Sequence, residues 1–163
     1  MHYLVKMLVR ADNAKEALEQ AQMDADSMVE YQYIDWYDMN GRWGDSKAYG
    51  IKSKKGKQLL EEGMAENRNE FDRAMAAIRY MMDNYSDDEI YNENFTQVDQ
   101  KQSEYYLSKY QFTVASGRAD AAAVYAMDGT LWGSRVDNDK DLENILADNK
   151  DKKLWVVPVD VHN

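Results

Sequence analysis

Residues 3–10 read YLVKMLVR, and their side chains alternate between two faces of the chain. A period of two with β-branched support is typical of a β-strand. Residues 153–162, KLWVVPVDVH, predict a strand that closes the chain. We expect these two strands to lie side by side and antiparallel. One face of the first strand carries Tyr3, Val5, Met7 and Val9, and the other carries Leu4, Lys6, Leu8 and Arg10.

A helix and a second strand are predicted directly after the first strand. Asp12 and Asn13 are candidate N-cap residues, and Glu16 stands three positions after Asn13, as in a capping box. Alanines and a few larger apolar residues then recur at helical spacing, which favours a helix that lies close against a sheet. Residues 31–37, YQYIDWY, predict a strand parallel to the first if the crossover is right-handed.

The middle of the chain predicts a helical insertion at about residues 55–100. Residues 57–85 have the strongest helical periodicity of the sequence, and Gly63 leaves open whether they form one helix or two. Residues 83–104 are polar and acidic, which predicts a loop with at most a short turn of helix. If the insertion helix has an apolar face wider than the sheet can cover, we expect the chain to form a homo-oligomer.

The last third of the chain returns to strands. Residues 105–115 and 121–127 predict two strands, and the second meets an Asp-Gly turn at residues 128–129. Asp137 or Asn138 then caps a short helix before the closing strand.

This order of elements predicts an α+β fold. It reads β-α-β, a helical insertion, and β-β-α-β, which is the order of a ferredoxin-like split βαβ sandwich. We expect a single domain over residues 1–163, with a mostly antiparallel sheet and helices on one face. The closing strand lies at an edge of the sheet in that topology, where Pro158 and its missing N–H are tolerated.

Composition excludes several classes of function. A net charge of −10 disfavours direct binding of nucleic acid, because lysine and arginine supply that affinity, and it favours a basic protein partner. Without cysteine the chain has no disulfide, thiolate nucleophile or cysteine-ligated metal. No apolar run approaches the roughly 18 residues of a membrane span, and the first residues lack the features of a signal peptide. We therefore expect a cytoplasmic protein that does not bind membranes.

The segment DWYDMNGRWGD, residues 35–45, has two interpretations. As a structural corner, it turns at Asn40 and Gly41, and the guanidinium of Arg42 stacks on an aromatic ring and pairs with an aspartate. As a binding site, the same side chains hold a flat or anionic ligand or a side chain of a partner. The spacing does not decide between them. The candidate binding residues are Asp35, Trp36, Tyr37, Asp38, Arg42, Trp43 and Asp45.

A second candidate surface is acidic. It lies in the polar stretch after the long helix and would bind a basic protein partner, occupying a surface that normally binds nucleic acid. The alternative is a solvated loop, because runs of like charge are common in ordinary loops. The candidate residues are Asp83, Asp87, Asp88, Glu89 and Glu93.

Metal and catalytic motifs are incomplete, so we expect no metal, no cofactor and no catalytic residue. Pairing of the terminal strands brings His2 near His162, but no third ligand is identifiable. Residues 137–148 begin like a calcium loop but have Leu142 where the loop needs glycine, which favours a helix start. Asp35 and Asp38, together with Arg42, are candidates for general acid–base catalysis, although their spacing does not require that role.

The segment 35–45 also resembles part of a group of small proteins encoded by phages, prophages and some archaeal and bacterial genomes. In that group an aromatic-rich strand is followed by Gly-Arg-Trp, as at residues 41–43 here. The resemblance carries over no catalytic residue. With the charge, it leads us to expect a non-enzymatic acidic protein-binding module, a virus-encoded inhibitor of a host nucleic-acid-binding or defence protein. The alternative is a small enzyme or ligand-binding protein that uses carboxylates and Arg42 in a pocket beside Trp36 and Trp43.

Overall fold

The structure of the chain is a computed structural model, and it describes residues 2–96, 123–128 and 131–162. The chain divides into two compact units, Met1–Asn67 with Ala122–Asn163, and Arg68–Ala121. The strand predicted at 105–115 lies outside the described residues, as does Gly129 of the predicted Asp-Gly turn.

The centre of the first unit is the pair of strands β1 (His2–Arg10) and β6 (Leu154–His162). They pair antiparallel along their whole length, with His2 opposite His162 and Arg10 opposite Leu154. This confirms the predicted pairing of the terminal strands.

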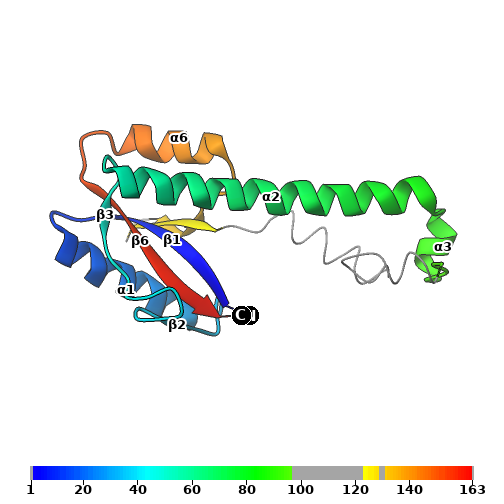
Figure 1. Cartoon of the computed structure of the whole chain (residues 1–163), viewed down its shortest axis with the longest axis horizontal. Coiled ribbons are helices and arrows are strands. Elements are labelled where there is room, and N and C mark those ends of the chain that lie inside the picture. Colours follow the sequence, from blue (N-terminus) through cyan, green and yellow to red (C-terminus); the bar gives the residue numbers. More distant parts are fainter. Residues whose placement is uncertain (1, 97–122, 129–130, 163) are drawn as a thin grey trace. The chain divides into compact units, whose positions relative to one another are not determined.

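Four shorter strands complete a mixed sheet, with the order β2-β6-β1-β4-β5 among the described residues. β4 (Val124–Asp128) lies parallel to β1, and β5 (Leu131–Arg135) is antiparallel to β4. β2 (Trp36–Asp38) and β3 (Tyr49–Gly50) both pair antiparallel with β6. The α+β class and the mostly antiparallel sheet are therefore confirmed (Figure 1).

β6 is not an edge strand, so the predicted place for Pro158 was wrong. β2 pairs with one end of β6 and β3 with the other, and Pro158 lies between them. The hydroxyl of Ser46 donates a hydrogen bond of 2.6 Å to the carbonyl oxygen of Pro158. The N–H and C=O of a strand residue point to the same side, so the missing N–H of Pro158 faces a gap between two strands.

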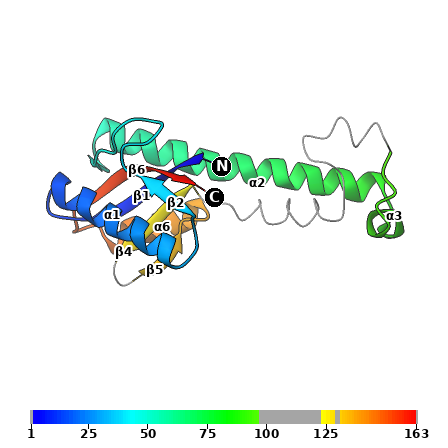
Figure 2. The same ribbon diagram turned by 90° about the horizontal axis from the view of Figure 1, so that it is seen from below.

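Helices cover both faces of the sheet, and the prediction of helices on one face was wrong (Figures 1 and 2). α1 (Ala14–Glu30) packs on the face that includes Met7 and Val157. The beginning of α2 (Lys54–Asn84) and α6 (Asp139–Asp148) pack on the face that includes Leu8 and Val156. The two central strands carry apolar side chains on both faces, and burying both requires a layer of helices on each side.

Asparagines cap both of the predicted shorter helices. The side chain of Asn13 accepts hydrogen bonds from the N–H groups of Lys15 and Glu16 at the start of α1. Asn138 accepts from the N–H of Asp141 at the start of α6, which decides between the two predicted caps. Residues 137–148 thus form a helix start, as their sequence indicates.

The strand predicted at 31–37 is shorter in the structure. α1 runs on to Glu30, and Tyr31 is its C-cap. Gln32 takes the left-handed backbone conformation, with φ at 61°, and turns the chain before β2 begins at Trp36. The tyrosines at 31 and 33 suited a strand by propensity, but the end of the helix and the turn occupy these positions.

α2 is one continuous helix, and Gly63 does not divide it. A Cβ at Gly63 would stand 2.5 Å from a methyl group of Val124, so glycine allows α2 to lie close to the sheet. The buried ammonium of Lys6 donates to the carboxylate of Glu66 on the same helix at 2.7 Å. Asn67 donates to the carbonyl of Val136 at 2.7 Å and accepts from the N–H of Ala123 at 2.5 Å.

The second unit is described for residues 68–96. α3 (Asp87–Tyr91) begins with a complete capping box between Ser86 and Glu89, which confirms the short turn of helix in the predicted loop. α2 runs on to Asn84, and residues 97–104 of that loop lie outside the described residues. Met81 and Tyr85 form a small core with Ile90 and Phe95. No described helix has the length and apolar character that would let it cross a bilayer.

Candidate functional site

The segment 35–45 is a compact loop held by its own backbone. β2 supplies Trp36, Tyr37 and Asp38, and Asp38 accepts a hydrogen bond of 2.8 Å from the N–H of Asn40. The N–H of Gly44 donates to the carbonyl of Gly41 at 2.9 Å, and Gly44 has a positive φ of 91°. Short polar side chains and glycines in this order favour tight turns, so the local sequence accounts for the local path.

The loop closes over the carboxylate of Asp160, which lies two residues before the end of β6. Asp160 is only 4% exposed, and its Oδ2 accepts a hydrogen bond of 2.8 Å from the backbone N–H of Arg42. His2 Nδ1 donates to Oδ1 at 2.9 Å. Gly41 lies against the same carboxylate, where a Cβ would overlap Oδ2. Asp160 therefore joins β6 to both β1 and the loop.

The surroundings of Asp160 favour its charged form. Burial acts to raise its pKa, but the hydrogen bonds from the Arg42 N–H and from His2, with the charges of those two residues, outweigh burial and lower the pKa. The carboxylate is thus a structural anion rather than a proton donor at neutral pH.

An aromatic cluster lies beside this carboxylate. Trp36 stacks on His162, with ring centroids 5.2 Å apart and 10° between the planes. His2 meets the edge of both rings, at 5.2 Å from Trp36 and 5.3 Å from His162. Nδ1 of His162 lies 3.3 Å from Oδ2 of Asp35. The predicted approach of His2 to His162 is confirmed, because they are opposite residues of β1 and β6.

The other candidate residues of the segment contact α1 or solvent and not the aromatic cluster. Tyr37 donates from its hydroxyl to Asp26 on α1 at 2.6 Å, and burial, this hydrogen bond and the charge of Asp26 raise its pKa. Arg42, Trp43 and Asp45 are exposed. Among the described residues, the guanidinium of Arg42 has neither the aromatic stacking nor the ion pair that the corner interpretation expected. Arg42 holds the corner through its backbone instead.

Sequence reasoning missed Asp160, which is the centre of this arrangement. Its signal was a single carboxylate within the apolar run VVPVDVH. In the described part of the chain, no group of three or more His, Asp or Glu side chains could hold a metal ion. His2 and His162 therefore belong to no such group. The use of residues 35–45 as a binding surface stays a prediction.

Comparison with known proteins gives a family. The model of a domain of unknown function, DUF7995, matches residues 36–163. The chain belongs to the DUF7995 family. No curated protein and no solved structure matches the chain.

The DUF7995 match includes the acidic candidates and, apart from Asp35, all of segment 35–45, but not the whole sheet. It begins at Trp36 and contains Arg42, Asp160 and His162. β1 and α1 precede it, so His2 and the helix that covers one face come from outside the matched residues.

The acidic candidates of this DUF7995 chain lie in the second unit. We call residues 80–96 the acidic tip; it comprises the end of α2, α3 and the residues after α3. Asp87, Asp88 and Glu89 occupy the first turn of α3, where the positive end of the helix dipole favours carboxylates. Two hydrogen bonds from Ser86 lower the pKa of Glu89, and burial opposes them weakly. Asp83 and Glu93 flank the helix, and all five carboxylates are exposed.

Proposed function

We propose that this DUF7995 chain is a non-enzymatic acidic protein-binding module whose acidic tip docks on a basic surface of a partner protein. One observation carries the proposal: residues 80–96 contain five aspartates and glutamates and no lysine or arginine. The negative potential of such a surface accelerates the approach of a positively charged partner and rejects nucleic acid.

Apolar side chains lie among these charges. Tyr91 is 68% exposed and Met82 is 65% exposed, although both are large. Exposed aromatic and methionine side chains beside carboxylates are the composition of protein interfaces, since the apolar groups supply affinity and the charges supply selectivity.

The acidic tip also has its own ordered framework. The capping box fixes the start of α3, and the rings of Tyr85 and Phe95 meet edge to face at 5.0 Å. A surface that is ordered before binding loses less entropy on association than a flexible one. This supports a docking surface over a merely solvated loop.

The resemblance of segment 35–45 to phage and prophage proteins supports a more specific proposal. We propose a virus-encoded inhibitor of a host nucleic-acid-binding or defence protein, which acts in the host cytoplasm. The acidic tip would occupy a cationic surface that normally contacts phosphates, and the inhibited protein would then lose its nucleic acid.

Neutralisation of the acidic tip tests this function. The variant carries Asp83→Asn, Asp87→Asn, Asp88→Asn and Glu93→Gln, and it leaves Glu89 in its capping box. The control neutralises four exposed carboxylates of the first unit through Glu61→Gln, Glu143→Gln, Asp148→Asn and Asp151→Asn. Both variants lose the same net charge.

Each immobilised protein is incubated with host lysate and eluted with a salt gradient. We expect basic nucleic-acid-binding proteins to be retained by the wild type and the control and to be lost by the tip variant. Purified partner and its nucleic acid then test inhibition directly, by competition. If the tip variant and the control retain the same proteins, the charge acts nonspecifically and the proposal is wrong.

The alternative function, a small enzyme or ligand-binding protein, rests on the exposed tryptophans of segment 35–45. Trp36 is 43% exposed and Trp43 is 50% exposed, on a loop anchored to Asp160. Since Arg42 holds the fold through its backbone N–H, Arg42→Ala leaves this anchor in place and tests the guanidinium alone. Loss of a ligand or partner by a folded Arg42→Ala variant, with the acidic tip intact, would favour this alternative.

We also propose that the sheet is a variant of the ferredoxin-like split βαβ sandwich. β1, α1 and β2 support it, since β6 lies between the two strands and is antiparallel to both. The parallel pair of β1 and β4 departs from a purely antiparallel sheet. Self-association through α2 stays a prediction.

A further inference from the structure

Asn40 and Gly41 form the one asparagine–glycine pair of the sequence. The side-chain amide of an asparagine can react with the backbone nitrogen of the next residue. Glycine favours this reaction because it has no side chain and restricts the backbone least. The pair lies in the loop whose next residue, Arg42, donates its N–H to the buried carboxylate of Asp160. A reaction at this pair therefore acts directly on the anchor of segment 35–45.

Both reacting groups are free of hydrogen bonds to the described residues. The Asn40 side chain is exposed, and its amide has no hydrogen-bond partner within the described ranges. The peptide unit between Asn40 and Gly41 likewise has no hydrogen bond to any described residue, through either its C=O or its N–H. This peptide unit can rotate without the loss of a hydrogen bond, so the Asn40 side chain can approach the Gly41 nitrogen in the folded chain.

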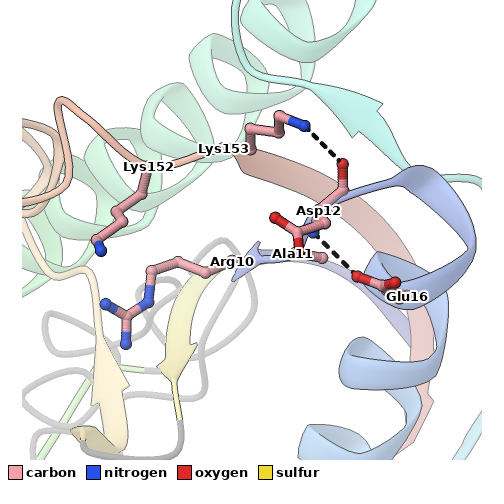
Figure 3. Close-up of a pocket in the computed structure, with 6 residues that line it drawn as sticks. All are labelled: Arg10, Ala11, Asp12, Glu16, Lys152 and Lys153. Carbon is pink, nitrogen blue, oxygen red and sulfur yellow. Dashed lines mark hydrogen bonds between the residues drawn. The ribbon is translucent and has the colours of Figure 1, made fainter.

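Asn13 has the opposite surroundings, although the small residue Ala14 follows it. Its side-chain oxygen accepts from the N–H groups of Lys15 and Glu16, both at 3.1 Å. Its side-chain nitrogen donates to the Glu16 carboxylate at 2.7 Å. Figure 3 shows this start of α1 beside a pocket of about 310 Å³, where the Asp12 N–H also donates to Glu16, at 3.1 Å. Asn13 would have to break these bonds before it could react.

We propose that Asn40 is a site of spontaneous deamidation in the folded protein, and that the reaction releases segment 35–45 from Asp160. The Gly41 nitrogen loses its proton to hydroxide and attacks Cγ of Asn40. The bond between Cγ and Nδ2 then breaks, and ammonia leaves with a proton from water, which restores the hydroxide. The intermediate is a succinimide ring, in which the Gly41 nitrogen is bonded both to Cγ and to the backbone carbonyl carbon of residue 40.

Water opens the succinimide at either of its two carbonyl carbons. Attack at Cγ leaves aspartate at position 40. Attack at the backbone carbon leaves isoaspartate, in which the main chain runs through Cγ. Both routes consume one water and release one ammonia, so no oxidant or reductant is needed. The mass rises by about one dalton, and a neutral amide becomes a carboxylate.

The products do not fit the present path of the loop. Isoaspartate inserts a methylene group into the main chain directly before Gly41, which lies against the carboxylate of Asp160 with no room for a Cβ. The added atom displaces the chain there, and the 2.8 Å hydrogen bond from the Arg42 N–H to Asp160 is lost. Either product also places a negative charge near Asp38, whose Oδ1 accepts from the N–H of residue 40 at 2.8 Å, and like charges repel.

Incubation of the full chain in mildly alkaline H₂¹⁸O, once folded and once in urea, tests the reaction. Mass spectrometry of peptides measures the modified fraction at Asn40, and electron-transfer fragmentation separates aspartate from isoaspartate. The heavy oxygen distinguishes this modification from any that arises later, during digestion in ordinary water. We expect the rate in the folded chain to be within about tenfold of the rate in urea, because the reaction needs local motion and not global unfolding.

Two controls accompany this measurement. Asn13 is the internal control, and we expect it to stay unmodified in the folded chain. Asn40→Gln is the control variant, because its side chain is one methylene longer and closes a six-membered ring more slowly. Ion exchange separates the modified protein by its added charge, and hydrogen exchange then reports the Arg42 N–H. We expect faster exchange in the modified protein and no change in Asn40→Gln after the same incubation.

Two results would overturn the proposal. If Asn40 reacts more than about tenfold more slowly in the folded chain than in urea, the fold protects the pair and the site is wrong. If the Arg42 N–H exchanges at the same rate in the modified and the unmodified protein, the release of segment 35–45 from Asp160 is wrong. Neither result bears on the acidic tip, which shares no residue with this site.

Discussion

Gly41 lies so close to the buried carboxylate of Asp160 that a Cβ at this position would overlap the carboxylate. We predict that Gly41→Ala lowers the free energy of unfolding by about 1–3 kcal/mol, because either the loop or Asp160 must move. Urea unfolding followed by circular dichroism measures the change. A further expected effect is exposure of the Arg42 N–H to solvent, measured by faster hydrogen exchange.

Gly50→Ala is the matched control. Gly50 also lies in the first unit, but a Cβ there has no heavy atom within 4 Å. We expect a change within about 0.5 kcal/mol. Equal effects of the two substitutions would show that close approach to Asp160 is not what requires glycine at position 41.

Asp160 is predicted to make stability depend on pH in the acid range. Burial raises its pKa, but the hydrogen bonds of Arg42 and His2 lower it more strongly, so the folded state has the lower pKa. A lowered folded pKa stabilises the fold above the ordinary carboxyl pKa of about 3.9, and this contribution is lost as pH falls through the folded pKa. We expect Asp160→Asn to be destabilised most at pH 7 and progressively less toward pH 2, measured by urea midpoints.

Asp45→Asn is the control for the removal of one carboxylate from the same region, because Asp45 is exposed. If the gap between the wild type and Asp160→Asn stayed constant from pH 7 to pH 2, the effect would come from packing and not from the ionised carboxylate.

The stacking of Trp36 on His162 is predicted to stabilise the end of the sheet. Trp36→Ala removes the stacked ring and its edge contact with His2, and we expect a loss of about 1–2 kcal/mol. Trp43→Ala removes a tryptophan of similar exposure from the same loop, and we expect almost no loss of stability. Thermal unfolding of both variants measures the two losses of stability. A larger loss for Trp43→Ala than for Trp36→Ala would contradict a stabilising role of the aromatic cluster.

We predict that, among the polar residues of α2, Asn67 contributes most to the stability of the sheet. Its buried side chain pairs with the backbone of both Val136 and Ala123, and Asn67→Ala leaves two buried backbone groups without a partner. We expect a loss of about 2–4 kcal/mol in urea unfolding. Asn84→Ala on the same helix removes one exposed hydrogen bond, to Tyr80, and serves as the control with a small expected effect.

The local sequence predicted the elements that depend on neighbouring residues. Alternation identified β1 and β6, and short polar residues predicted caps at residues 12–13 and 137–138, where the structure has Asn13 and Asn138. The pairing of β1 with β6 followed from the order of elements. These features depend on side chains a few positions apart or on a small set of allowed topologies.

The features that the sequence did not predict depend on residues far apart in the chain. β3 is two residues long and exists because it pairs with β6. Lys6 is buried under α2 and paired with Glu66, which is 60 positions away. Asp160 was missed because its partners, His2 and Arg42, are 158 and 118 positions away. No periodicity within a short window reports such partners.

The pairing of β1 with β6 sets the order in which this fold can form. Its central ladder joins residues that are up to 160 positions apart, so it closes a long loop. β1 and α1 are synthesised before β6 and lack this neighbour until β6 has been made. Folding is therefore expected to be slow and late, with a high contact order, and the apolar face of β1 would need shielding from aggregation in the meantime.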